Sequence, residues 1–162
     1  MLIRVINRYS EAVGLLYTAN TLNVRQTRTI LDMQKCILPH RLRMFRSLHI
    51  DVPLRSRWKD GSVVGDGRLW PGNILTFWAP AWSVLAEMHG LMNLTVSLGP
   101  QTQRVVEVDR ETLTHVMEPM MAVKHVPAFV LEILFPLPDG LLEDVLQHLG
   151  DPPFAVEAKD AF

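Results

Sequence analysis

The sequence predicts an α/β fold in which irregular strand–helix units form a small, mostly parallel, leucine-rich-repeat-like curved sheet with helices on one face. Segments with two-residue apolar alternation are separated by segments with helical spacing, an order typical of crossover units and a parallel sheet. The strand centres lie near residues 23, 50, 96 and 132, so the units recur without a fixed period. Because the strands alternate apolar and polar residues, we expect one sheet face to be covered and the other to meet water.

Residues 9–55 contain two predicted helices and two predicted strands. Residues 9–19 place alanine and leucine at helical spacing, and a short strand follows near residue 23. Residues 27–39 form the second helix, which ends at its proline. Residues 41–55 continue as a strand, because the stretch SLHIDVPL alternates apolar side chains with others.

Residues 55–75 break every periodicity, and glycine and proline punctuate them. A loop of this length inside a compact domain is uncommon, and is usually functional or disordered. We therefore expect a loop insertion at 55–78.

Residues 79–162 return to alternating helices and strands. Asp109 can cap one of the helices, and Pro119 should end that helix and begin a short new one. In chain order we expect a helix over 79–91, a strand over 92–100, a helix over 110–117, a short helix over 120–126, a strand over 129–138, a helix over 141–149 and a frayed tail or weak edge strand over 151–162.

The composition bounds the class of protein. The chain has 162 residues, which suggests a single domain over 1–162. Its net charge of −1 provides no overall field for nucleic acid or an anionic membrane. Cys36 is the only cysteine, so no intramolecular disulfide can form, which favours a reducing compartment. No apolar run is long enough for a signal peptide or a membrane span, and we expect an intracellular protein, cytoplasmic or nuclear.

Four stretches carry a resemblance to a known family: SEAVGLLYTANTLNV, LPHRLRMFRSLHI, WSVLAEMHGLMNLTVSL and MEPMMAVKHVPAFVLEI. Their order and spacing over residues 9–136 resemble an uncharacterised domain-of-unknown-function family of filamentous ascomycete fungi, whose members look F-box-like and leucine-rich-repeat-like. The F-box-like opening of that family has no counterpart in the sequence. The chain therefore looks N-terminally shortened, adaptor binding through an F-box is not carried over, and the resemblance implies no catalytic residue.

His49 and Asp51 are the first candidate pair. At i and i+2 on a strand they point the same way, as a base and its orienting partner would in a small hydrolase-like enzyme. The alternative is two polar side chains on the solvent face of a strand. We favour the alternative, because no nucleophile or third ligand has a recognisable place beside the pair.

The sequence indicates neither a metal site nor a cofactor site. None of the six histidines forms an i, i+4 pair, and none lies near Cys36 in a metal-ligand pattern. Cys36 is expected to pack in the core, as free cysteine usually does.

Tryptophans gather in and beside the predicted loop, at Trp58, Trp70 and Trp78. Exposed aromatic residues are enriched at interfaces, although these three could instead fold back over the edge of the core.

We expect a non-enzymatic protein-interaction module with a protein partner and no nucleic acid, membrane or cofactor. The alternatives are the hydrolase-like enzyme using His49 and Asp51, and a shortened gene product without a function of its own. The expected contact residues are Arg25, His49, Asp51, Thr95, Ser97 and Glu132 from the strand face, and Trp58, Trp70 and Trp78 from the loop.

Overall fold

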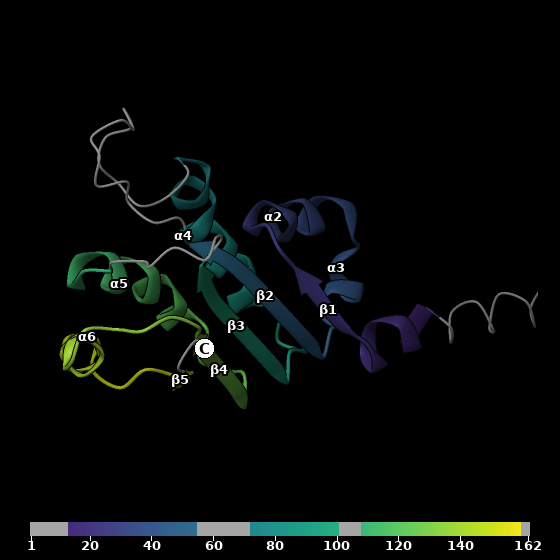
Figure 1. Ribbon diagram of the computed structural model, residues 1–162. Helices are drawn as coiled ribbons and strands as arrows, with labels where there is room; N and C mark the ends of the chain where they lie inside the picture. The colour runs from purple at the N-terminus through teal and green to yellow at the C-terminus, as the bar shows by residue number, and fades with distance from the viewer. Residues whose placement is uncertain (1–12, 55–71, 101–107, 160–162) are drawn as a thin grey trace, which may run out of the picture.

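The computed structural model describes residues 13–54, 72–100 and 108–159 of the chain. Five strands form one sheet in the order β1-β2-β3-β4-β5, and every neighbouring pair is parallel (Figure 1). The strands are β1 (Thr21–Val24), β2 (Ser47–Leu54), β3 (Asn93–Pro100), β4 (Ala128–Ile133) and β5 (Ala155–Ala158). The helices are α2 (Thr27–Cys36), α3 (Pro39–Leu42), α4 (Gly72–Glu87), α5 (Arg110–Met117), the 3-10 helix η1 (Glu118–Ala122) and α6 (Leu141–Leu149). Residues 13–19 are also helical.

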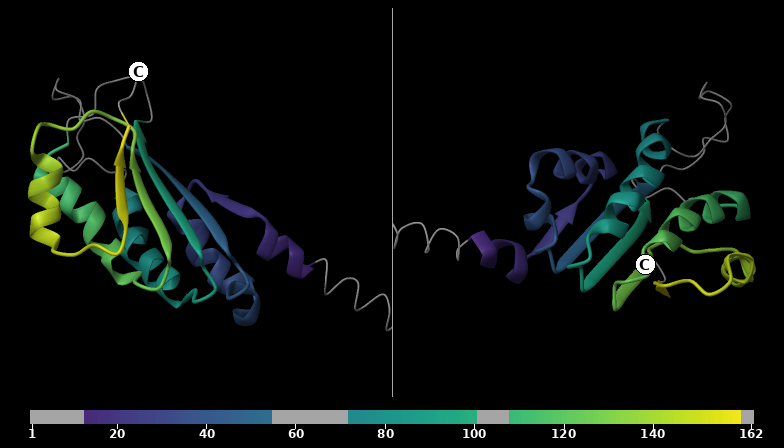
Figure 2. Two further views of the ribbon diagram at one scale, coloured as in Figure 1. Left: turned by 90° about the horizontal axis from the view of Figure 1, so that it is seen from below. Right: turned by 180° about the vertical axis from the view of Figure 1, so that it is seen from behind.

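The helices α2, α4, α5 and α6 lie on one side of the sheet (Figure 2). The order of the strands explains this arrangement. Crossovers between parallel strands are right-handed in nearly all proteins, and right-handed crossovers that all step in the same direction place their helices on the same side. The structure thus confirms the predicted α/β class, the parallel sheet and the single helical layer.

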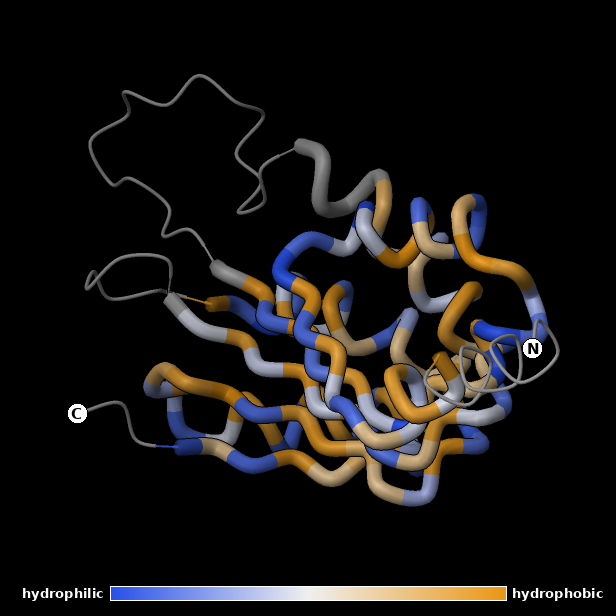
Figure 3. Tube along the Cα trace, turned by 90° about the vertical axis from the view of Figure 1, so that its right-hand side faces the viewer, coloured by the Kyte–Doolittle hydropathy of each residue, from blue (hydrophilic) through white to orange (hydrophobic). Residues whose placement is uncertain are grey.

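The core lies between the sheet and this helical layer. The side chains of β3 that point towards the helices are fully buried: Leu94, Val96 and Leu98. On the helical side of the core, α4 contributes the buried side chains of Trp82 and Leu85. Apolar and polar residues alternate along the strands (Figure 3). Because of this alternation, every second residue of a strand is apolar and faces the helices, as the sequence predicted.

The helices α5 and α6 have the predicted bounds. Asp109 caps α5, because its Oδ1 accepts the backbone N–H of Thr112 at 2.8 Å. Pro119 lies at the start of η1, where its missing N–H does no harm.

The helix α4 corrects the predicted loop insertion at 55–78. It begins at Gly72, seven residues before the predicted start, and Pro80 lies inside it. Residues 55–71 lie outside the described part of the chain. The local proline signal was overridden by tertiary packing, because Trp78 is buried against the core and the guanidinium of Arg28 from α2 lies over the ring of Phe77.

The segment after β1 departs from the prediction at two further places. Residues 39–42 form the short helix α3 with Pro39 in its first turn, so the strand predicted from residue 41 begins only at Ser47. Cys36 is exposed rather than in the core. The buried side of α2 consists of Thr27, Ile30 and Met33, at intervals of three, and Cys36 ends the helix outside it.

The tail over 151–162, predicted to be either frayed or a weak edge strand, contains an edge strand, β5. β5 pairs with β4, and Phe154 anchors it, since this ring is buried with its centroid 5.1 Å from that of Phe129. Residues 160–162 lie outside the described part of the chain. No helix among the described residues is both long and apolar enough to span a membrane.

Gly90 marks a close approach between two backbone segments. A Cβ at this position would lie 1.7 Å from the carbonyl oxygen of Arg43, a separation that no side chain tolerates. The Gly90 carbonyl in turn accepts a hydrogen bond from the Arg46 guanidinium at 2.6 Å. The segments that precede β2 and β3 are therefore held close together at a position where only glycine fits.

Candidate functional site

The face of the sheet opposite the helices carries a row of polar side chains, which we call the open face. In the strand register Asp51 lies beside Ser97, Ser97 beside Glu132, and Glu132 beside Glu157. Two residues earlier in β2 and β3, on the same face, His49 lies beside Thr95. The structure thus brings together the five strand-face candidates from β2, β3 and β4.

Hydrogen bonds join four of the open-face residues into one chain, which we call the polar network. His49 Nε2 lies 2.8 Å from Ser97 Oγ, and Ser97 Oγ lies 2.6 Å from Glu132 Oε2. The Lys159 ammonium, just after β5, donates to Glu132 Oε1 at 2.5 Å. The network therefore links β2, β3, β4 and the residue that follows β5.

The direction of each hydrogen bond follows from the charge of Glu132. The hydrogen bonds from Lys159 and Ser97 lower the pKa of this carboxyl group, so it is ionised at neutral pH and can only accept. Ser97 must then donate its single proton to Glu132. The His49 Nε2–H must in turn donate to Ser97 Oγ. The hydrogen bond to Glu132 likewise raises the pKa of Lys159.

This arrangement does not activate Ser97 as a nucleophile. His49 donates to the serine instead of accepting its proton, and Glu132 is a weak base because its pKa is lowered. Ser97 is only 4% exposed, since its neighbours His49 and Glu132 flank it. The chemistry that the network supports best is structural, because it holds polar side chains in fixed positions on the open face.

His49 and Asp51 share a face but do not form the pair of base and orienting partner considered from the sequence. Within the described residues His49 hydrogen-bonds to Ser97, whereas the exposed Asp51 has no hydrogen bond or ion pair. Nor does the described part of the chain contain a group of three or more His, Cys, Asp or Glu residues that could hold a metal ion.

The remaining candidates lie in different surroundings. Arg25 follows β1 directly and is exposed, and Thr95 is half-buried on the open face. Trp58 and Trp70 lie outside the described residues. Trp78 is not an exposed contact residue of a loop but follows the alternative in which the ring folds back onto the core: it is 2% exposed inside α4, and its Nε1–H donates to the Val116 carbonyl at 2.9 Å.

Lys159 is the member of the polar network that sequence reasoning missed. The sequence predicts either a frayed tail or a weak edge strand at this position. Glu157 and Lys159 have the i, i+2 spacing of two side chains on one strand face, and this spacing was the available signal.

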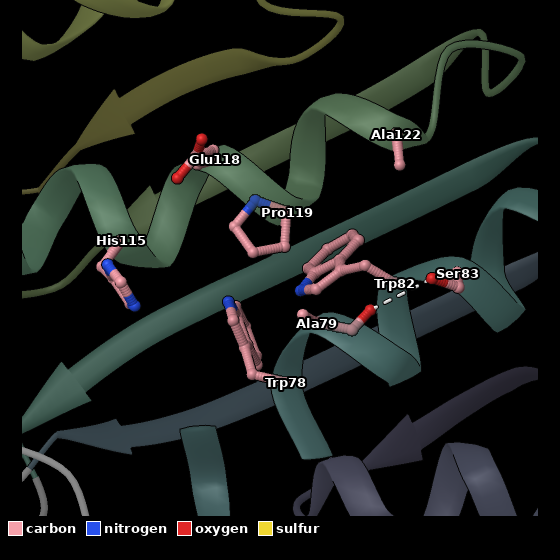
Figure 4. Close-up of a pocket in the computed structure, with 8 residues that line it drawn as sticks. All are labelled: Trp78, Ala79, Trp82, Ser83, His115, Glu118, Pro119 and Ala122. Carbon is pink, nitrogen blue, oxygen red and sulfur yellow. Dashed lines mark hydrogen bonds between the residues drawn. The ribbon is translucent and has the colours of Figure 1, made fainter. Parts of the chain in front are cut away.

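A second feature is a cleft of about 400 Å³ on the helical side of the molecule, between α4 and the α5–η1 segment (Figure 4). The indole nitrogen of Trp82 is buried there and has no hydrogen-bond partner among the described residues. The residues that line the cleft are Trp78, Ala79, Trp82, Ser83, His115, Glu118, Pro119 and Ala122.

The fold and the open face define a class of protein: an α/β domain with an all-parallel, five-stranded sheet, a single helical layer and a polar open face. A family model described as "Domain of unknown function (DUF7730)" matches residues 1–153, and the chain belongs to this family. This match confirms the predicted relation to an uncharacterised domain family. Neither a curated protein nor a solved structure matches the chain.

Proposed function

We propose that this protein is a non-enzymatic protein-interaction module that binds its partner through the open face. The observation that carries the proposal is the uneven covering of the sheet: within the described residues, helices pack on one face and a hydrogen-bonded polar network spans the other. All-parallel sheets are usually covered on both faces, so an open face calls for an explanation. Stacked strand–helix units in repeat proteins use such a sheet surface for binding.

The partner chemistry follows from the charges that the network leaves unused. Glu132 and Lys159 already neutralise one another. Arg25, which directly follows β1, and Asp51, in the middle of β2, are exposed, and neither forms an ion pair with another described residue. A protein segment that presents a carboxylate to Arg25 and a basic side chain to Asp51 complements this corner of the open face. The preorganised network reduces the ordering cost of such binding.

The enzymatic alternative has one favourable observation, the contact between His49 and Ser97. The direction of the hydrogen bonds argues against this alternative. Ser97 donates a hydrogen bond to Glu132, whose lowered pKa makes it too weak a base to remove the serine proton at neutral pH. We therefore propose that the protein is not an enzyme and that it binds its partner without a metal or a cofactor.

Origin and location belong to the same proposal. The stretches over residues 9–136 resemble F-box-like, leucine-rich-repeat-like proteins of filamentous fungi. The unpaired, exposed thiol of Cys36 is compatible with a reducing compartment, the cytoplasm or the nucleus. F-box adaptor binding is not part of the proposal.

The test is affinity capture from a fungal lysate with the wild-type chain and two charge-reversal variants. Asp51→Lys changes the open face, whereas Glu87→Lys makes the same charge change at an exposed position in α4. Deletion of residues 55–78 would be a poorer test, because it removes the first part of α4 together with the buried Trp78.

We expect a partner that is captured by the wild type and by Glu87→Lys but lost with Asp51→Lys. Its purified form should bind Asp51→Lys about tenfold or more weakly in calorimetry, the effect of a broken charge-assisted contact. Equal affinity of the partner for both variants would remove the open face from the proposal. Thermal melts of all three chains control for folding.

A further inference from the structure

We propose that the cleft between α4 and the α5–η1 segment is a small-molecule site, for an uncharged and mostly apolar compound whose carbonyl oxygen accepts a hydrogen bond from the Trp82 Nε1–H. The proposal is independent of the open face, because the cleft lies on the helical side of the sheet (Figures 2 and 4).

The donor is the unpaired indole nitrogen of Trp82. The side chain is 1% exposed, and its Nε1 has no hydrogen-bond partner among the described residues. Buried polar groups in native proteins almost always have a partner, because an unpaired one loses its hydration without compensation. The nitrogen is on the side of the indole ring that faces Trp78 of the same helix, beside the cleft that Pro119 lines from η1 (Figure 4). A partner for this nitrogen is therefore expected from inside the cleft.

The position of this donor is fixed before any ligand arrives. The Trp82 ring stacks on Phe129 of β4, with 5.8 Å between centroids and 20° between planes. Its other neighbour, Trp78, meets it edge-on at 5.3 Å and 77°. A donor held by two aromatic contacts keeps its direction, which lowers the ordering cost of binding.

Trp78 provides an internal comparison within the same helix. Its indole N–H, four residues earlier in α4, donates to the Val116 carbonyl of α5 at 2.9 Å. The two indoles line one cleft, yet only that of Trp78 is paired within the described residues. The Trp82 donor thus remains unpaired within the described residues.

The cleft has the size and the lining of a small-molecule site. Its volume of about 400 Å³ falls within the range of known ligand pockets, which are mostly apolar with a few placed polar groups. Trp78, Pro119 and Ala122 contribute apolar surface. The lining contains no lysine or arginine, and its one carboxylate, Glu118, is exposed, so the cleft has no cationic side chain to hold an anion. These features disfavour an anionic ligand, and the proposed ligand is an uncharged one.

The experiment compares two rigid probes that differ by one carbonyl oxygen, 1-indanone and indane. Each is titrated into the ¹⁵N-labelled full chain, and the four tryptophan indole N–H signals are followed by NMR. Trp82→Phe identifies the Trp82 signal. We expect 1-indanone to move this signal to lower field and to bind about five- to tenfold more tightly than indane, the usual gain from one hydrogen bond.

Three results would overturn the proposal. These are equal affinity for the two probes, no shift of the Trp82 signal at millimolar probe, or a Trp82 N–H that contacts only an ordered water and ignores both probes. Trp82→Phe should equalise the two affinities if it folds. The comparison of probes on the wild type stands without it, and Asp51→Lys should bind 1-indanone as the wild type does.

Discussion

The two faces of the sheet are built from the same strands, yet different forces hold them. In β3, Leu94, Val96 and Leu98 are buried under the helices, whereas Thr95 and Ser97 between them point to the open face. The covered face is stabilised by removing apolar surface from water. The open face is stabilised by directed hydrogen bonds across the strands. The comparison teaches that folding depends mainly on one half of each strand, whereas the other half is less constrained by the core.

The largest expected effect is on the covered face. Leu98→Ala should lower the free energy of unfolding by about 2–5 kcal/mol, because it leaves a cavity under the helical layer. Thr95→Ala, three residues away on the open face, should cost less than about 1 kcal/mol. Urea unfolding of both variants measures the difference. Similar losses for the two would mean that both faces contribute packing alike.

A smaller effect is expected from the centre of the polar network. Ser97→Ala should cost about 1–2 kcal/mol, since it removes the acceptor for His49 and a donor to Glu132 at once. Ser83→Ala in α4, where the exposed hydroxyl donates a long hydrogen bond to the Ala79 carbonyl at 3.4 Å, is the matched control and should change stability by less than about 0.5 kcal/mol. If the two serine variants unfold at the same urea concentration, the network adds nothing to stability.

The smallest of the stability effects depends on pH. The pKa of Glu132 is lower in the folded chain than in the unfolded chain, so below the ordinary glutamate pKa the unfolded state binds more protons. The stabilisation is present at neutral pH and is lost as the pH falls through the lowered value. The raised pKa of Lys159 acts in the opposite direction, because its contribution is lost only as the pH rises through the folded value.

Glu132→Gln should therefore flatten the acid side of the stability profile, by about 1 kcal/mol between roughly pH 5 and pH 3. Melting temperatures of the wild type and the variant across this range measure it. Glu143→Gln, at an exposed position in α6, is the control and should keep the wild-type slope. A wild-type slope in Glu132→Gln would contradict the role of Glu132 in the network.

Much of the fold could be predicted from the sequence, because local signals and packing agree. The bounds of α5 and α6 follow from apolar spacing together with Asp109 and Gly140 at their starts. The start of α4 could not be predicted, because Pro80 and the preceding glycines locally favour a loop, and only the burial of Trp78 against the rest of the chain outweighs them.

The candidate site was predicted in part. Two-residue alternation places His49, Ser97 and Glu132 on one face of their strands, but it cannot say which strands are neighbours or which residues lie side by side. That register follows from the packing of the helical layer. Lys159 and the unpaired Trp82 N–H were missed for a related reason. Whether a side chain finds a hydrogen-bond partner depends on residues that are distant in sequence.

Thiol labelling of neighbouring residues in β2 tests most directly whether one face of the sheet is open. In a Cys36→Ser background, Asp51→Cys and Val52→Cys each provide a single thiol on opposite faces of one strand. Asp51 is exposed and Val52 is 3% exposed. We predict that Asp51→Cys reacts at close to the rate of an unfolded thiol under native conditions, while Val52→Cys stays protected until the chain unfolds. Equal protection of both thiols would contradict the account, because the open face would then be covered.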